Sequence, residues 1–203
     1  MFLRLFPAAC LLCIAGLAQT TIVPAPEDAY QIRYAANLNV GDSIVNVQNS
    51  GARGGPFSGG DICVNAYLVT PDSQLQACCS CRLAPNGLAS WSVNRDLAIN
   101  LLTPAVPTSA TIKLLASAQT TCNASLVTQA NLAPGLVAWG TTIHALPPAV
   151  PGALSFAYTT VETQFAKKPL SADELSKLTM FCGFIVGNGS GFGICKSCSL
   201  GGR

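Results

Sequence analysis

Charge is the scarcest property of this 203-residue sequence: Asp, Glu, Lys and Arg together make up 10% of it, against about 25% in ordinary globular proteins. The formal net charge is +2, and no basic cluster is denser than Lys167-Lys168, which excludes the electrostatic footprint of a nucleic-acid-binding protein. No apolar run approaches the roughly 18–20 residues of a membrane span. We therefore expect neither a nucleic-acid partner nor a membrane span, and a surface built from Ser, Thr, Asn, Gln and Gly.

Residues that carry chemistry are also few. The chain has a single histidine, His144, which any Ser-His-carboxylate triad would have to use. The nucleophile-elbow pattern Gly-x-Ser-x-Gly does not occur, and the loop carboxylates show no spacing typical of glycoside hydrolysis. We predict a protein without catalytic residues, cofactor or metal. A secreted hydrolase that uses loop carboxylates, with Asp61 and Glu162 as the residues to test, remains a second alternative.

The N-terminus has the pattern of an export signal. Arg4 supplies a positive charge, 11–17 form a short apolar stretch, and Gly16-Leu17-Ala18 is a small-x-small cleavage site. We predict a signal peptide at 1–18 and a secreted protein of the periplasm, the cell surface or the extracellular medium.

Cysteine usage agrees with export. Of ten cysteines, Cys10 and Cys13 fall within the predicted signal peptide. An even number in a secreted chain predicts a disulfide framework. The close spacing of Cys78, Cys79 and Cys81, together with the pair Cys195 and Cys198, is also compatible with a zinc site. Bonding Cys78 to Cys79 would strain the geometry, so these two have different partners. The disulfide candidates are Cys63, Cys78, Cys79, Cys81, Cys122, Cys182, Cys195 and Cys198.

Short strands dominate the middle of the chain. Segments rich in β-branched and aromatic residues, bounded by Gly, Pro or Asn, occur at 43–49, 62–70, 75–83, 88–94, 110–117, 135–146 and 154–165. Asn86-Gly87 can supply the positive φ angles of a tight turn, so we predict a hairpin between 75–83 and 88–94. Trp91 then faces the core. We predict a second hairpin between 135–146 and 154–165.

The C-terminal part predicts one amphipathic helix at 171–186. Ser171 and Glu174 form a capping box, and apolar residues follow at helical spacing. These residues, which we expect to dock on the strands, are Leu175, Leu178, Phe181, Cys182 and Ile185.

The predicted fold is mainly β: a disulfide-stapled antiparallel β-sandwich, Ig-like or jelly-roll-like, with one C-terminal α-helix. Residues 19–41 are expected to form a polar, Pro-containing lead-in. Residues 42–203 are expected to form a single sandwich domain that ends in the helix at 171–186 and a disulfide-anchored tail.

Four stretches resemble a group of secreted, cysteine-rich bacterial proteins of uncharacterised function from soil-dwelling lineages. They are GDSIVNVQNSGARGG, CCSCRLAPNG, LVAWGTTIHALP, and SADELSKL with NGSGFGICKSC. The resemblance covers about residues 40 to 198, and the double-cysteine stretch is its most specific part. It implies a bacterial exported protein, and it implies no activity and no catalytic residue.

The leading functional hypothesis is a secreted, non-enzymatic structural or adhesive protein that self-associates. Near-zero net charge lowers the barrier to association, and residues 19–41 could add a strand to a neighbour's sheet edge. The first alternative is a module that binds carbohydrate or another extracellular polymer. Its candidate ligand contacts are Tyr67, Tyr158, Glu162 and His144.

Overall fold

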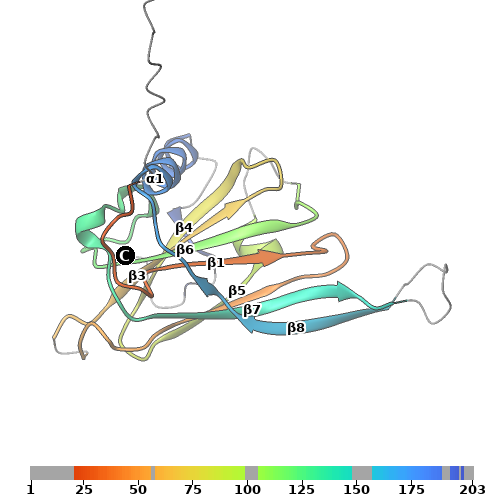
Figure 1. Cartoon of the computed structure of the whole chain (residues 1–203), viewed down its shortest axis with the longest axis horizontal. Helices are drawn as coiled ribbons and strands as arrows, with labels where there is room; N and C mark the ends of the chain where they lie inside the picture. Colours follow the sequence, from red (N-terminus) through yellow and green to blue (C-terminus); the bar gives the residue numbers. More distant parts are fainter. Residues whose placement is uncertain are drawn as a thin grey trace, which may run out of the picture.

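Two stacked β-sheets and one α-helix make up the fold (Figure 1). The computed structural model describes residues 21–55, 58–98, 105–147, 157–188, 193–196 and 198. The signal peptide predicted for 1–18 lies outside this range. The prediction of a mainly β, disulfide-stapled sandwich with one C-terminal helix is confirmed.

The larger sheet has the strand order β10-β4-β3-β6-β1-β9, and the smaller sheet has the order β5-β2-β7-β8. All neighbouring strands are antiparallel except β10 and β4, which are parallel. The larger sheet contains β1 (Tyr30–Ala35), β3 (Ile62–Val69), β4 (Leu75–Leu83), β6 (Ala110–Ser117), β9 (Ala166–Lys167) and β10 (Gly193–Ile194). The smaller sheet contains β2 (Ile44–Asn49), β5 (Leu88–Ser92), β7 (Leu136–Ala145) and β8 (Tyr158–Gln164).

The main hydrophobic core lies between the two sheets. In β2, Val45 and Val47 are buried in it while Asn46 between them faces outward, as the period of two requires. Trp91 of β5 is fully buried there, as predicted, and Leu114 of β6 packs into the same cluster from the larger sheet. The alternation in β2 therefore identifies the inner and outer faces of the smaller sheet.

The helix α1 (Ala172–Gly187) covers the outer face of the larger sheet (Figure 1). It begins where predicted, because the Ser171 hydroxyl accepts a hydrogen bond of 3.1 Å from the Glu174 backbone N–H. Leu178 and Cys182 are buried in a second cluster with Tyr67 of β3. Phe181 was predicted to pack on the strands, but this is wrong, since 40% of its surface stays exposed.

The predicted hairpin between 75–83 and 88–94 is wrong. β4 pairs with β3, whereas β5 pairs with β2 in the other sheet, and a π-helix, η1 (Val93–Leu97), follows β5. Asn86 has a positive φ of 64°, and Gly87 N–H bonds to Ala84 C=O at 2.8 Å. Pro85 cannot adopt a positive φ, so the turn has the type II pattern, which does not match the twist of a hairpin. The chain therefore crosses from one sheet to the other here.

The boundary predicted at residue 42 is also wrong, because much of 19–41 belongs to the sandwich. β1 lies inside the larger sheet, with β6 on one side and β9 on the other. Upstream, Val23 is buried and its N–H bonds to the Leu170 carbonyl at 2.7 Å. The strand that we expected a neighbour to receive is therefore taken up by this chain's own sheet.

The second predicted hairpin is confirmed. β7 and β8 pair antiparallel from Trp139 opposite Gln164 to Ala145 opposite Tyr158. The residues 148–156 that connect them lie outside the described part of the chain. Figure 1 shows the far end of this hairpin reaching beyond the end of β1.

Candidate functional site

All eight cysteines predicted to form disulfides do so. The pairs are Cys63–Cys122, Cys78–Cys182, Cys79–Cys195 and Cys81–Cys198. The zinc alternative is thereby excluded for these thiols, and no group of three or more metal-ligating side chains occurs in the described part of the chain. Four disulfides indicate an oxidising environment outside the reducing cytosol.

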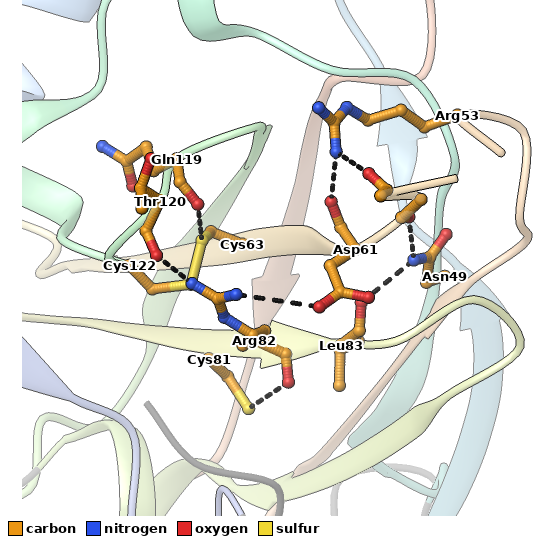
Figure 2. Close-up of polar contacts among 12 residues, drawn as sticks. Asn49, Arg53, Asp61, Cys63, Cys81, Arg82, Leu83, Gln119, Thr120 and Cys122 are labelled. Carbon is orange, nitrogen blue, oxygen red and sulfur yellow. Dashed lines mark hydrogen bonds and ion pairs between the residues drawn. A yellow bond between two sulfur atoms is a disulfide. The ribbon is translucent and has the colours of Figure 1, made fainter. Parts of the chain in front are cut away.

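Asp61, a carboxylate considered for hydrolysis, lies in a structural network (Figure 2). Its carboxylate lies 3.7 Å from the guanidinium of Arg82 on β4, which also donates to the Thr120 carbonyl. The Arg53 guanidinium donates to the Asp61 carbonyl at 2.8 Å. The amide of Asn49 completes the network by bonding to the Leu83 carbonyl at 3.0 Å. These contacts fasten the loop before β3 and the loop after β6 to the sheet.

Two further carboxylates meet at Ser92, where β5 ends. Asp42 accepts hydrogen bonds from the Ser92 hydroxyl and, at 3.0 Å, from the Asn94 N–H. Asp96 accepts one of 2.8 Å from the Ser92 N–H. Both carboxylates therefore satisfy N–H groups at the start of η1. Glu162 lies on β8 of the smaller sheet and accepts a hydrogen bond of 3.4 Å from Asn46, whereas Asp61 lies in the loop before β3 of the larger sheet. The structure therefore shows no contact between the two carboxylates of the hydrolase alternative.

Tyr67 is wrong as a candidate ligand contact. The residue is fully buried between β3 and α1, and its hydroxyl donates a hydrogen bond of 2.6 Å to the Ala124 carbonyl. Burial raises the pKa of this phenol. The tyrosine therefore belongs to the packing of the helix against the sheet.

The other three candidate contacts are exposed and lie on one hairpin. His144 is on β7, and Tyr158 and Glu162 are on β8. His144 lies opposite Thr159, next to Tyr158 in the register. All seven residues of β8 are exposed. We therefore take the β7–β8 hairpin and the sheet that carries it as the candidate functional site.

The backbone of β8 has an open edge. Phe165 N–H bonds to the Ala138 carbonyl at 2.9 Å, and Leu146 N–H bonds to the Ala157 carbonyl at 2.8 Å. Hydrogen-bonded pairs recur at every second residue of an antiparallel ladder. The odd-numbered residues of β8 therefore direct their N–H and C=O groups toward β7. The even-numbered residues direct theirs away from the sheet, and these are Tyr158, Thr160, Glu162 and Gln164.

The outer face of the smaller sheet carries a continuous polar row. By register, Ser90 of β5 lies opposite Asn46 of β2, Asn46 opposite Trp139 of β7, and Trp139 opposite Gln164 of β8. The Ser90 hydroxyl donates to the Asn46 amide oxygen at 2.6 Å, and the Asn46 amide nitrogen donates to Glu162. We call these five side chains the Trp139 row.

The sequence alone did not identify this row. The alternation in β7 puts Val137, Trp139, Thr141 and Ile143 on one face, but it does not say whether that face is inner or outer. The buried residues Leu136 and Ala138 show that the core lies on the opposite face. Trp139 is thus partly exposed on the outer face, in contrast to the buried Trp91.

Arg33 of β1 joins the two sheets on the inner side of the site. Its guanidinium donates at 2.8 Å to the Thr142 hydroxyl and at 2.6 Å to the Thr163 carbonyl, and it lies 5.9 Å from the centre of the Phe165 ring. Burial lowers the pKa of this guanidinium, while the charge of Glu162 opposes the shift. A cleft of about 340 Å³ opens beside it toward His144.

Comparison with protein-family models, curated proteins and solved structures finds no match to this chain. Among the residues that the structure describes, no helix has the length and apolar content needed to cross a bilayer.

Proposed function

We propose that this is a secreted, non-enzymatic structural or adhesive protein whose copies associate by pairing β8 of one with β8 of another. The observation that supports this best is the open edge of β8, a seven-residue strand exposed along its whole length. Such an edge is a template for a further strand, and folded proteins usually block it with prolines, bulges or several charges. β8 carries a single charge, that of Glu162.

The register of pairing follows from the direction of the backbone groups. An antiparallel pair related by a twofold axis at Val161 places Tyr158 opposite Gln164 and Thr160 opposite Glu162 of the second copy. All four outward residues are then in hydrogen-bonded pairs, and two hydrogen bonds in each of four pairs make about eight. The same register places Glu162 opposite a threonine of the second copy. It thereby avoids placing two Glu162 carboxylates opposite each other, where their like charges would repel.

Side chains on the inner face support the same register. Val161, 41% exposed in the single chain, meets Val161 of the second copy at the axis, and both lose apolar surface. The contact uses the same strand on both copies, so it closes as a dimer. The sheet offers little electrostatic opposition, since Glu162 is the one residue among Asp, Glu, Lys and Arg that its four strands contain.

The test uses a proline on the open edge. Thr160→Pro removes an outward N–H and leaves the bonds of Thr159 and Val161 to β7 in place, because edge strands tolerate proline where the N–H faces solvent. Thr160→Ala keeps the N–H and is the matched control. We expect light scattering over a concentration series to show a reversible dimer for the native chain and the control, and a monomer for Thr160→Pro.

Two results would refute the proposal. A native chain that stays monomeric at the highest concentrations would show that β8 does not pair. A Thr160→Pro variant that dimerises as well as Thr160→Ala would show that another surface mediates assembly. Circular dichroism and a thiol assay confirm that each variant retains its strands and disulfides.

A further inference from the structure

We infer that the outer face of the smaller sheet binds a neutral polysaccharide chain, with one sugar ring stacked on Trp139. This is a binding site distinct from the edge of β8. It goes beyond the proposed self-association and does not depend on it.

The position of Trp139 is the first argument. A tryptophan buries a large apolar surface when it lies in a core, as Trp91 does. Trp139 instead lies on the outer face, between the amides of Asn46 and Gln164. Figure 1 shows the larger sheet on one side of this sheet and no described helix or strand on the other. The indole is therefore partly exposed on the exterior face, bordered on both sides by amides.

The second argument is the set of polar groups around the ring. A sugar hydroxyl both donates and accepts, and amides and carboxylates offer fixed partners for it. The bonds from Ser90 to Asn46 and from Asn46 to Glu162 hold these side chains in place across the strands. Neither the Gln164 amide nor the Gln48 amide forms a side-chain hydrogen bond with any other described residue, so both can bond to a ligand.

Charge selects the kind of polysaccharide. The four strands of this sheet contribute one carboxylate, Glu162, and neither lysine nor arginine. An anionic chain on this face would therefore meet a carboxylate and no cation from the four strands, because the nearby Arg33 lies on the inner side of the sheet, whereas a neutral chain meets an acceptor for its hydroxyl groups. The same argument disfavours phosphate-containing ligands and nucleic acids.

Shape selects a chain over a single sugar. The Trp139 row crosses four adjacent strands, which corresponds to about 14 Å at roughly 4.8 Å from strand to strand. The row is exposed or partly exposed along its length and lies on a sheet face rather than in a pocket. A small ligand needs a concave site that encloses most of its surface, whereas an extended chain can contact the row from Ser90 to Gln164.

The two surfaces are compatible with each other. Pairing of β8 uses backbone groups at the edge of the sheet, and the Trp139 row uses side chains on its face. A dimer would present two such rows to the same polymer, and binding would then gain from effective concentration. The two proposals therefore predict separable effects of substitution.

The experiment is a pull-down of the disulfide-intact chain on insoluble β-glucan, chitin, xylan and starch, with polygalacturonate as the anionic control. Fluorescence is recorded in parallel with soluble fragments of any polymer that retains the protein. The chain has two tryptophans, and because Trp91 is buried, a change in emission on binding reports on Trp139. We expect retention on at least one neutral polymer, none on polygalacturonate, and a change in tryptophan emission.

Three variants identify the site. Trp139→Ala should weaken binding about tenfold, as expected for the loss of one stacked ring, and Trp139→Phe should restore part of it. Leu88→Ala removes an exposed apolar side chain of the same face, so it is the control for a loss of apolar surface, and we expect it to bind as the native chain does. Thr160→Pro, which blocks the edge of β8, should still bind each sugar chain. It should lose only the added affinity that a dimer gains from binding the polymer with two Trp139 rows.

The inference is wrong if no neutral polymer retains the protein, or if Trp139→Ala binds as well as the native chain. It is also wrong if polygalacturonate retains the protein as strongly as the neutral polymers do. None of these results affects the light-scattering test of β8 pairing, so the two proposals can fail separately.

Discussion

Cys78 and Cys79 are neighbours in β4, yet their disulfides lie on opposite faces of the larger sheet. Cys78 bonds to Cys182 of α1 on the outer face, with their Cα atoms 5.8 Å apart. Cys79 bonds to Cys195 among the core residues, with a Cα separation of 4.8 Å. Successive side chains of a strand point to opposite faces. Two adjacent residues therefore fix the helix on one side of the sheet and the tail on the other.

Removal of the Cys78–Cys182 bond by the double substitution Cys78→Ala and Cys182→Ala should lower the free energy of unfolding by about 2–5 kcal/mol. The bond closes a loop across 104 positions and holds α1 on the sheet. Urea denaturation followed by circular dichroism measures the change. A loss below about 1 kcal/mol would mean that apolar packing alone holds the helix, as judged against the typical cost of losing a disulfide.

The substitution Tyr67→Phe should lower the free energy of unfolding by about 1–2 kcal/mol, because the buried Ala124 carbonyl loses its hydrogen bond. The matched control is Tyr34→Phe, since Tyr34 is 58% exposed and its hydroxyl remains in contact with water in the variant. Denaturant unfolding of both variants provides the comparison. Equal stability of the two would contradict a structural role for the Tyr67 hydroxyl.

Alkaline pH should ionise the buried tyrosines only as the protein unfolds. Burial raises the pKa of Tyr67, and burial together with the negative charge of Glu174 raises that of Tyr30, both above the ordinary value of about 10. The folded-state pKa lies above the unfolded one. The stability that these phenols contribute is therefore complete below about pH 10 and is lost as the pH rises toward the folded-state values.

Phenolate absorbance, measured across the pH range with and without urea, tests this expectation. The chain has four tyrosines, and the native protein should ionise fewer than four before its circular dichroism changes. Complete, reversible ionisation with the fold intact would contradict the burial of Tyr30 and Tyr67.

Replacement by alanine should change the stability of the protein in opposite directions at two glycines. A Cβ at Gly140 of β7 would clash with the Ile44 carbonyl oxygen, so Gly140→Ala should destabilise the protein by about 1–3 kcal/mol. In α1 a Cβ at Gly183 meets only the Ser125 side chain, at 3.8 Å, so Gly183→Ala should stabilise it by roughly 0.5–1 kcal/mol. Thermal unfolding of both variants measures the signs, and a stabilising Gly140→Ala would refute the close approach of β2.

The sequence was sufficient to predict those elements whose structure depends on residues close together in the chain. Segments rich in β-branched residues and bounded by turn residues predicted β2 and β6, and the capping residues Ser171 and Glu174 predicted the start of α1. The cysteine count predicted the disulfide set, but the pairing depends on which segments the fold brings together. Asn86-Gly87 was misleading because Pro85 before it selects a different turn.

β1 was missed because two of its inward side chains are polar. Gln31 and Arg33 face the core, so the strand lacks the usual alternation of apolar and polar residues. Gln31 donates to the Leu136 carbonyl at 2.7 Å, and Arg33 bonds to Thr142 and Thr163. These partners lie more than 100 positions later in the chain. The outward position of Trp139 could not be read from sequence for the same reason, since it depends on which face of β7 meets the larger sheet.

Three bonded cysteines lie in β4, and their positions limit the order in which the disulfides can form. Their partners follow 104, 116 and 117 positions later, and a chain is made from its N-terminus onward. Only Cys63 and Cys122, 59 positions apart, can join correctly before the last segment is complete. Until then Cys78, Cys79 and Cys81 are neighbouring thiols that can react with the wrong partner. Three of the four native disulfides can therefore form only after the C-terminal segment is complete, and any bond mispaired before then has to be reshuffled, a step that takes seconds to hours depending on oxidant and isomerase.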